Sequence, residues 1–518
     1  MKLRNIFITA LLLFAIVSCK KDWLDINKSP NDLPTSTPDF TFAAASNRIV
    51  SSLGPNELGE YWSGHWTQSS TYIISNTIFS YQFNNTNFDY YSGYYDILKD
   101  LDFSIKNATG VYAYWGGPAR VLKAYVFQML VDMYGNIPYT DALKGLESLA
   151  PKFDDQKAIY EDLIKTLDTA ITILKANPLI AAYSGSDFVF AGQPNTTNLT
   201  VGGANTKWIQ FANSLKLRIL MRQSRMAGRD TYIIAEINKA AAVTEGFLPA
   251  GLDVSVNPGY LASAGKLNPF YENWGYNAAG SIQALARYPR PTTFLLSSMI
   301  TTNDTFRLKR LAYPKGGPEA NPYPAEIVAN YVGVPFGSSS GYLSQNTSYI
   351  GPSQIKKGEF SRPMLLMTNA ESWFLLAEAK QRYGTSVTLS GTAQSYYEQG
   401  VKEAFRLTGT TATYGADKAT TLLTSGLDLA DWTASTDKLK AIWWQKWLAL
   451  TNYSGLEAWS EYRKNNYPNI PASASTASNA ARPVRLFYPQ GELASNGVNV
   501  LAQGTIDVFT SRLFWDVD

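Results

Sequence analysis

The sequence has almost no residues suited to metal or disulfide chemistry. Only one cysteine, Cys19, and one histidine, His65, occur among its 518 residues. A zinc site of the Cys/His kind and a disulfide framework are therefore excluded within a single chain. Residues 337–341 (GSSSG) match the G-x-S-x-G pattern of serine hydrolases, but that motif needs a histidine later in the chain, and none follows. We expect no catalytic residues and no metal-binding residues.

The chain also lacks an excess of charge of one sign. Its 45 basic and 42 acidic residues give a formal net charge of +3, and removal of residues 1–18 would delete Lys2 and Arg4, leaving 43 against 42. Nucleic-acid binding requires an excess of basic residues to neutralise the phosphate backbone, and this chain has no such excess. Nucleic acid is therefore excluded as a partner. Apolar residues make up 45% and charged residues 17%, a balance typical of a globular protein with a large core.

The apolar run at the N-terminus is too short to span a membrane. Residues 6–17 are mostly apolar and follow two basic residues, whereas a spanning helix needs about 20 apolar residues. This pattern predicts a signal peptide over residues 1–18. Residues 16–19 (IVSC) are similar to a lipobox, so we expect Cys19 to carry a lipid anchor. The alternative is an ordinary signal peptide followed by an incidental cysteine.

Apolar residues at helical spacing are abundant. Residues 119–134 are apolar on more than one side, which predicts a buried helix that ends at Gly135. Similar patterns predict helices over residues 40–53, 88–106, 154–174, 207–222, 232–243, 367–379, 393–405, 442–450 and 456–464. The small residues within 373–400 fit a tetratricopeptide helix pair, and such pairs stack into a superhelix.

Residues 246–365 have a different composition. They lack sustained periodicity and are dense in Pro, Gly, Asn and Ser, which predicts a large irregular, loop-rich insertion that carries little β-structure. The expected fold class is therefore mainly α, a tetratricopeptide-like helix-pair superhelix with this insertion.

Several strings together are more specific than periodicity. They are D-x-Y-G-x-I-P-Y-x-x-A-L at 132–143, W-x-x-F-A-N-S-L-K-L-R at 208–218, I-x-x-Q-K-W at 442–447, E-A-W-x-E-Y-R at 457–463 and R-x-x-Y-P-x-x-E-x-x-x-N at 485–496. With the N-terminal pattern, they make the chain resemble the SusD/RagB family over nearly its whole length. The resemblance implies a tether over 19–39 and one SusD-like domain over 40–518. Within it we expect a helical body at about 88–245 and 366–465, a loop-rich part at about 246–365 and a C-terminal cap at 466–518.

The resemblance also implies a function. Family members are outer-membrane lipoproteins that bind glycans or peptides and cap a TonB-dependent SusC-like transporter. We therefore expect a lipid-anchored protein, facing the cell exterior, that captures oligosaccharides without cleaving them. Lys20 and Lys21 directly after the cysteine depart from the acidic export signal of some relatives. No cofactor is expected; some relatives bind structural calcium, although no loop here has an EF-hand pattern.

Aromatic residues in polar segments are the candidate ligand-binding positions. The chain is 13% aromatic, and most of these rings are explained by core packing. In the family, the region after the first helix and the central loops supply rings to the ligand surface. The corresponding candidates here are Trp66, Tyr72, Tyr81, Trp274 and Tyr276. The alternative is that these rings pack against neighbouring helices.

Three other functions stay open at this point. The same lid mechanism could bind and import oligopeptides. A surface glycoside hydrolase would require two carboxylates about 5–10 Å apart in a cleft. A tetratricopeptide adaptor for another protein would show a bare concave groove, with Trp66 and Trp274 buried.

Overall fold

The computed structural model describes residues 36–53, 57–191, 201–319, 321–409, 412–479 and 481–517. Contacts divide the chain into residues 1–37 and a compact unit of residues 38–518, and the elements below belong to the second unit. The described part is mainly helical, as predicted, and its β-strands are short and paired two by two. The predicted signal peptide and Cys19 lie outside the described residues.

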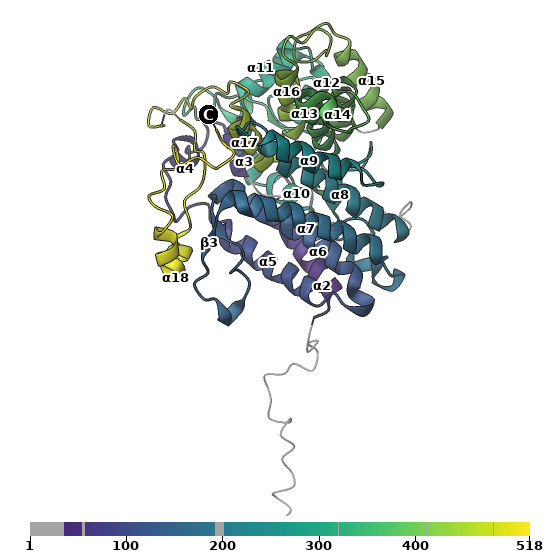
Figure 1. The fold of residues 1–518 in the computed structure, drawn as a ribbon. Helices are drawn as coiled ribbons and strands as arrows, with labels where there is room; N and C mark the ends of the chain where they lie inside the picture. The colour runs from purple at the N-terminus through teal and green to yellow at the C-terminus, as the bar shows by residue number, and fades with distance from the viewer. Residues whose placement is uncertain are drawn as a thin grey trace, which may run out of the picture. The chain divides into compact units, whose positions relative to one another are not determined.

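The first half of the body is a series of packed helices, which Figure 1 shows lying side by side. They are α2 (Pro38–Leu53), α5 (Tyr91–Lys106), α6 (Gly116–Tyr134), α7 (Gln156–Ala176), α8 (Val201–Arg222) and α9 (Asp230–Ala241). Helix α6 is buried on nearly all sides, as its apolar sequence predicts. It ends at Gly135, whose φ of 78° is a conformation that favours glycine. Asp155 caps α7 by accepting a hydrogen bond from the N–H of Ala158 at 2.9 Å.

The second half of the body is also built of packed helices. Its helices are α13 (Asn369–Tyr383), α14 (Ala393–Thr408), α15 (Ala412–Leu423), α16 (Lys438–Leu450) and α17 (Gly455–Asn465). Helices α13 and α14 form the predicted helix pair. They approach closely because Gly400 has no side chain: a Cβ there would lie 2.8 Å from Cε1 of Phe374. Helix α13 also packs on α8, which joins the two halves.

The loop-rich part contains more regular structure than its composition predicts. Three short helices occur in it, α10 (Pro269–Trp274), α11 (Thr293–Thr301) and α12 (Thr305–Leu311). Their caps, Asn268, Thr292 and Asp304, each accept a backbone hydrogen bond, which stabilises helices too short to show periodicity. The strands here are β4 (Val254–Val256), β5 (Pro289–Pro291), β6 (Ala312–Tyr313) and β7 (Tyr349–Ile350).

The remaining short elements connect these parts. After α2 come α3 (Glu57–Trp62), β1 (Trp66–Gln68) and α4 (Asn76–Phe79), in a stretch whose sequence predicts irregular backbone. Strands β2 (Ile137–Pro138) and β3 (Phe153–Asp154) pair with each other, and β8 (Met364–Met367) pairs with β4. Near the C-terminus lies α18 (Gln490–Leu501). The 3-10 helices are Gly110–Trp115, Gly145–Glu147, Ala181–Ser186, Leu285–Arg287, Val328–Asn330, Ser344–Asn346 and Gly384–Ser386.

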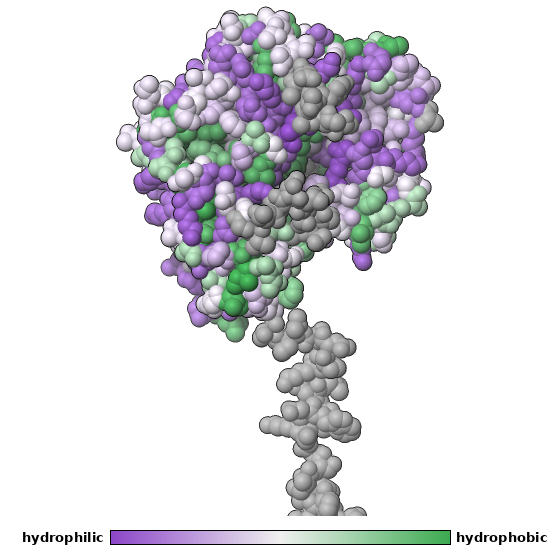
Figure 2. Space-filling view, turned by 90° about the vertical axis from the view of Figure 1, so that its right-hand side faces the viewer, coloured by the Kyte–Doolittle hydropathy of each residue, from purple (hydrophilic) through white to green (hydrophobic). Residues whose placement is uncertain are grey.

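The surface is a mixture of polar and apolar side chains. Figure 2 shows hydrophilic and hydrophobic residues interspersed over one face, which is hollowed near its centre. Within the described ranges, every helix is too short or too polar to cross a bilayer. The apolar helix faces are used instead to pack the helices against one another.

Candidate functional site

Four of the five candidate ligand-binding aromatics lie in the interior. The exposed fractions are 1% for Trp66, 4% for Tyr81, 5% for Trp274 and 1% for Tyr276. Trp66 and Trp274 meet edge to face, with their ring centroids 5.9 Å apart. The fold therefore brings two candidate residues that are far apart in the sequence into contact in the core. A buried ring has no face free for a sugar. In this structure these four side chains act as packing residues.

Tyr72 is different because it is half-exposed. Its ring lies 4.2 Å from that of Tyr288, with the two planes tilted by 35°. Both rings stand at the surface, next to Ile73, which is 96% exposed. We call Tyr72 and Tyr288 the tyrosine pair.

The tyrosine pair is assembled by strands β1 and β5. These strands pair antiparallel, with Gln68 opposite Pro289, so the residues that follow β1 lie beside those that precede β5. A third loop joins them where the N–H of Ser70 donates to the carbonyl of Tyr342 at 2.9 Å. Three segments far apart in sequence therefore meet at one surface.

Sequence reasoning missed Tyr288 and Tyr342. Both stand in polar stretches, and Tyr288 immediately precedes the P-R-P of β5. The local sequence holds no signal for Tyr288, because the three residues of β5 that follow it are all buried and its place at the surface depends on the pairing of β5 with β1.

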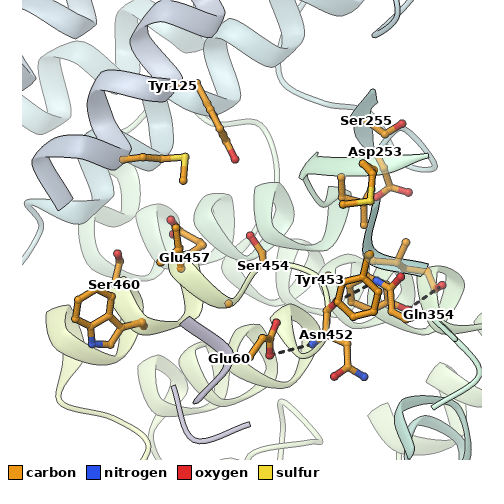
Figure 3. A pocket seen from close by; sticks show the side chains of 18 of the residues that line it. Glu60, Tyr125, Asp253, Ser255, Gln354, Asn452, Tyr453, Ser454, Glu457 and Ser460 are labelled. Atoms are coloured by element: carbon orange, nitrogen blue, oxygen red, sulfur yellow. Dashed lines mark hydrogen bonds between the residues drawn. The ribbon is translucent and has the colours of Figure 1, made fainter. Parts of the chain in front are cut away.

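A cavity of about 250 Å³ lies between the helical body and the loop-rich part (Figure 3). Its walls come from α6, α8, α17, strands β4 and β8, and the loops around residues 353, 362 and 453. Tyr125 and Ser454 extend into it from opposite sides, as Figure 3 shows. The cavity is separate from the tyrosine pair, whose two residues do not line it.

The charged groups that line the cavity already have partners. Arg218 donates to both oxygens of Glu371 at 2.6 and 2.7 Å. The other pairs are Glu60 with the N–H of Asn452 and Nδ1 of His65, Asp132 with Gln128 and Trp515, Asp253 with Arg406, Arg362 with Glu359, and Glu457 with Arg222. Burial raises the pKa of Asp132, and the nearby Arg222 only partly opposes this effect.

Behind the cavity lies a network of buried ion pairs. Arg222 is fully buried and contacts Glu457 at 2.5 Å and Glu461 at 2.6 Å. Burial raises the pKa of Glu461, but Lys446, Lys464 and Arg222 outweigh that effect and hold the pKa below its usual range. Glu457 and Glu461 are therefore buried, paired carboxylates that join α17 to α8.

Arg463 and His65 are buried and hydrogen-bonded. Arg463 donates to the carbonyls of Asp132 and Val484 at 2.7 and 2.8 Å, and burial lowers its pKa to about 10. The single histidine, His65, lies 2.9 Å from Glu60 through Nδ1 and 3.1 Å from the carbonyl of Trp447 through Nε2. It is a hydrogen-bonded core residue. Within the described ranges, no group of three metal-ligating side chains occurs.

The fold and these surfaces define a helical scaffold that carries loop-borne aromatic residues. Residues 30–489 match the SusD-like family model described as "Starch-binding associating with outer membrane". The chain belongs to this SusD-like family. Its members are non-catalytic binding proteins, so the protein is a binding protein and not an enzyme.

Solved structures show the same fold. A SusD homolog from Bacteroides fragilis superposes with a TM-score of 0.73 at 21% identity, covering 93% of this chain and 99% of that one. A chitin-binding SusD homolog from Flavobacterium johnsoniae gives 0.69 at 22%, covering 93% and 98%. A SusD/RagB family protein from Bacteroides thetaiotaomicron gives 0.69 at 20%, covering 93% and 99%. A comparison with curated proteins gave no match.

Proposed function

We propose that this protein captures oligosaccharides at the outside of the outer membrane and delivers them to a SusC-like TonB-dependent transporter. The observation that carries the proposal is the tyrosine pair, because it presents aromatic surface on loops held by a rigid pair of strands. Loops fixed on a scaffold are where binding residues concentrate.

The chemistry of this surface suits a neutral sugar chain. Aromatic rings contact the apolar faces of sugar rings, and their orientation is specific. The exposed side chains of Gln345 and Asn346 follow Tyr342 and offer amide donors and acceptors for hydroxyl groups. The family description names starch, and one relative is described as chitin-binding, which also supports a glycan.

The adaptor and hydrolase alternatives are weaker. Burial of Trp66 and Trp274 is what the adaptor hypothesis predicts. That hypothesis also predicts a bare groove, whereas the loops here carry the tyrosine pair and the body contains a cavity lined by polar groups. The hydrolase hypothesis conflicts with membership of a non-catalytic family.

The proposal predicts that Tyr72→Ala weakens oligosaccharide binding by about tenfold, because one wall of the tyrosine pair is removed. The full chain, purified in detergent, is titrated calorimetrically with maltohexaose, chitohexaose and a mixture of oligopeptides. Tyr183→Ala is the matched control, since Tyr183 belongs to another half-exposed pair, with Tyr112 at 5.0 Å. Binding of peptides alone would overturn the choice of ligand, and equal binding by wild type and Tyr72→Ala would overturn the site.

A further inference from the structure

Arg290 is a fully buried residue of β5, two positions after Tyr288 of the tyrosine pair. The 3-10 helix Ser344–Asn346, which we call the polar turn, carries the exposed side chains of Gln345 and Asn346. We propose that Arg290 is a positioning residue of the oligosaccharide surface, which holds the polar turn in place beside the tyrosine pair without touching the ligand. This inference rests on the proposed function, because it concerns the same surface.

The guanidinium of Arg290 connects β5 to the residues that follow the polar turn. Its Nε donates to Oγ1 of Thr347 at 3.0 Å, and its Cζ lies over the ring of Tyr349, 3.6 Å from the ring centroid. Its Nη1 donates at 2.7 Å to the carbonyl of Pro289, the residue that follows Tyr288. One side chain therefore contacts the segments on both sides of the proposed ligand surface.

Thr347 connects Arg290 to the polar turn. It is 1% exposed, and its hydroxyl donates to the carbonyl of Leu343 at 3.3 Å or of Ser344 at 3.2 Å. A hydroxyl has only one proton, and Arg290 has none to accept, so the oxygen must receive the bond from Arg290 and direct its proton to the turn. The guanidinium thus orients the hydroxyl, and the hydroxyl holds the backbone of the turn.

The start of the polar turn is held separately, by the residues just before Tyr72. The N–H of Tyr342 donates to Oγ of Ser70 at 2.8 Å, and the N–H of Ser344 donates to Oγ1 of Thr71 at 2.7 Å. These bonds place the beginning of the turn beside the tyrosine pair. The position of its end depends on the contact between Thr347 and Arg290.

A buried arginine without an acidic partner costs stability. No carboxylate in the described part of the chain pairs with Arg290; burial lowers its pKa to about 10, and only tyrosine side chains oppose that effect. The fully buried Arg307, in contrast, contacts Asp304 at 2.5 Å. Locally unfavourable residues of this kind are expected at functional sites, where the position of a group matters more than its contribution to stability.

The test uses two substitutions that break the same contact. Arg290→Met removes the guanidinium and fills much of its space, and Thr347→Val removes the hydroxyl but keeps the shape. The full chain in detergent is titrated calorimetrically with maltohexaose and chitohexaose. We expect each variant to weaken oligosaccharide binding about three- to tenfold. The double variant should bind within about twofold of Arg290→Met, because both changes act through one contact.

Arg307→Met is the matched control, since it removes an equally buried arginine whose partners are Asp304 and Gln445. It should leave oligosaccharide binding unchanged. It should also lower the thermal midpoint more than Arg290→Met does, because it leaves the buried carboxylate of Asp304 without its cation. A merely structural role for Arg290 would not produce opposite orders of binding and stability in the two variants.

Hydrogen exchange followed by mass spectrometry tests the positioning without a ligand. Exchange in residues 342–347 should rise in Arg290→Met and Thr347→Val and stay unchanged in Arg307→Met. Unchanged binding in both Arg290→Met and Thr347→Val, or equal weakening in Arg307→Met, would overturn the role of Arg290 and leave the tyrosine pair as the proposed site. No oligosaccharide binding by the wild type would overturn both proposals. Should Arg290→Met fail to fold, Thr347→Val decides by the same criteria.

Discussion

Arg222 shows how a single residue joins the two halves of the protein. It starts from α8, at the end of the first half, and its guanidinium reaches Glu457 and Glu461 on α17 in the second. The side chain is fully buried, so neither water nor salt can replace these contacts. Removing one partner of such a group leaves charge uncompensated in the interior.

We predict that Arg222→Met lowers the free energy of unfolding by about 3–5 kcal/mol. Methionine fills part of the space, but Glu457 and Glu461 would lose their closest shared cation, which leaves Lys446 at 3.8 and 3.2 Å from them. The measurement is urea unfolding followed by tryptophan fluorescence. Arg48→Met is the matched control, because Arg48 pairs with Asp100 at 2.7 Å while its side chain is 44% exposed, and we expect a loss below about 1 kcal/mol. Equal losses for the two variants would refute a structural role for the network.

Residue type alone did not reveal which aromatics are exposed. Trp66 and Tyr72 are six positions apart in similar polar sequence, yet Trp66 donates its indole N–H to Asn452 inside the core at 2.7 Å and Tyr72 stands half-exposed. The difference arises because Trp66 belongs to β1, which packs against α10 and pairs with β5. Tyr72 lies beyond Gln68, where this pairing ends. The contacts are made by residues hundreds of positions away.

At the scale of elements, the contact between α3 and α17 depends on two glycines. A Cβ on Gly59 would lie 2.2 Å from the backbone of Gly455, and a Cβ on Gly455 would lie 2.5 Å from the backbone N of Glu60. The two helices therefore touch backbone to backbone, and no side chain can rotate away to make room.

We predict that Gly59→Ala destabilises the protein by at least about 1–3 kcal/mol, since the added methyl group forces α3 and α17 apart. Gly93→Ala provides the control, because Gly93 lies inside α5 with nothing within 4 Å of its added Cβ. There alanine should be neutral or stabilising by up to ~1 kcal/mol. Thermal unfolding by circular dichroism compares them, and an unchanged midpoint for Gly59→Ala would show that the contact yields easily.

Long helices were predictable and short ones were not. Helices α6, α7 and α8 have 19 to 22 residues, so their apolar faces repeat over several turns. Helices α10, α11 and α12 have six to nine residues, which is at most about two and a half turns. They form because capping side chains and tertiary contacts compensate for the cost of starting a helix.

At the scale of the whole molecule, the predicted lipid anchor decides where the protein acts. The family is described as associating with the outer membrane, and the predicted lipid site is Cys19, outside the described residues. Acyl chains on this cysteine would attach the protein to the bilayer by apolar burial.

We predict that Cys19→Ala abolishes labelling of the protein with radioactive palmitate and moves it out of the membrane fraction in a high-salt wash. The physical reason is that acyl chains supply about 0.8 kcal/mol per buried methylene, which the variant loses. Ser18→Ala retains the cysteine and should still be labelled. Proteinase K applied to intact cells tests the exterior orientation. Palmitate label on Cys19→Ala, or protection of the wild type from the protease, would contradict this arrangement.

By itself the sequence determined the family, the mainly helical fold class and the positions of the long helices, because these follow from local periodicity, caps and specific strings such as residues 208–218. Only the tertiary structure decided which rings face solvent, where the buried ion network lies and that Gln128 and Glu457 share a cavity. The reason is physical: exposure and hydrogen-bond satisfaction depend on groups that the fold brings together from distant parts of the chain, and spacing along the sequence does not record those contacts.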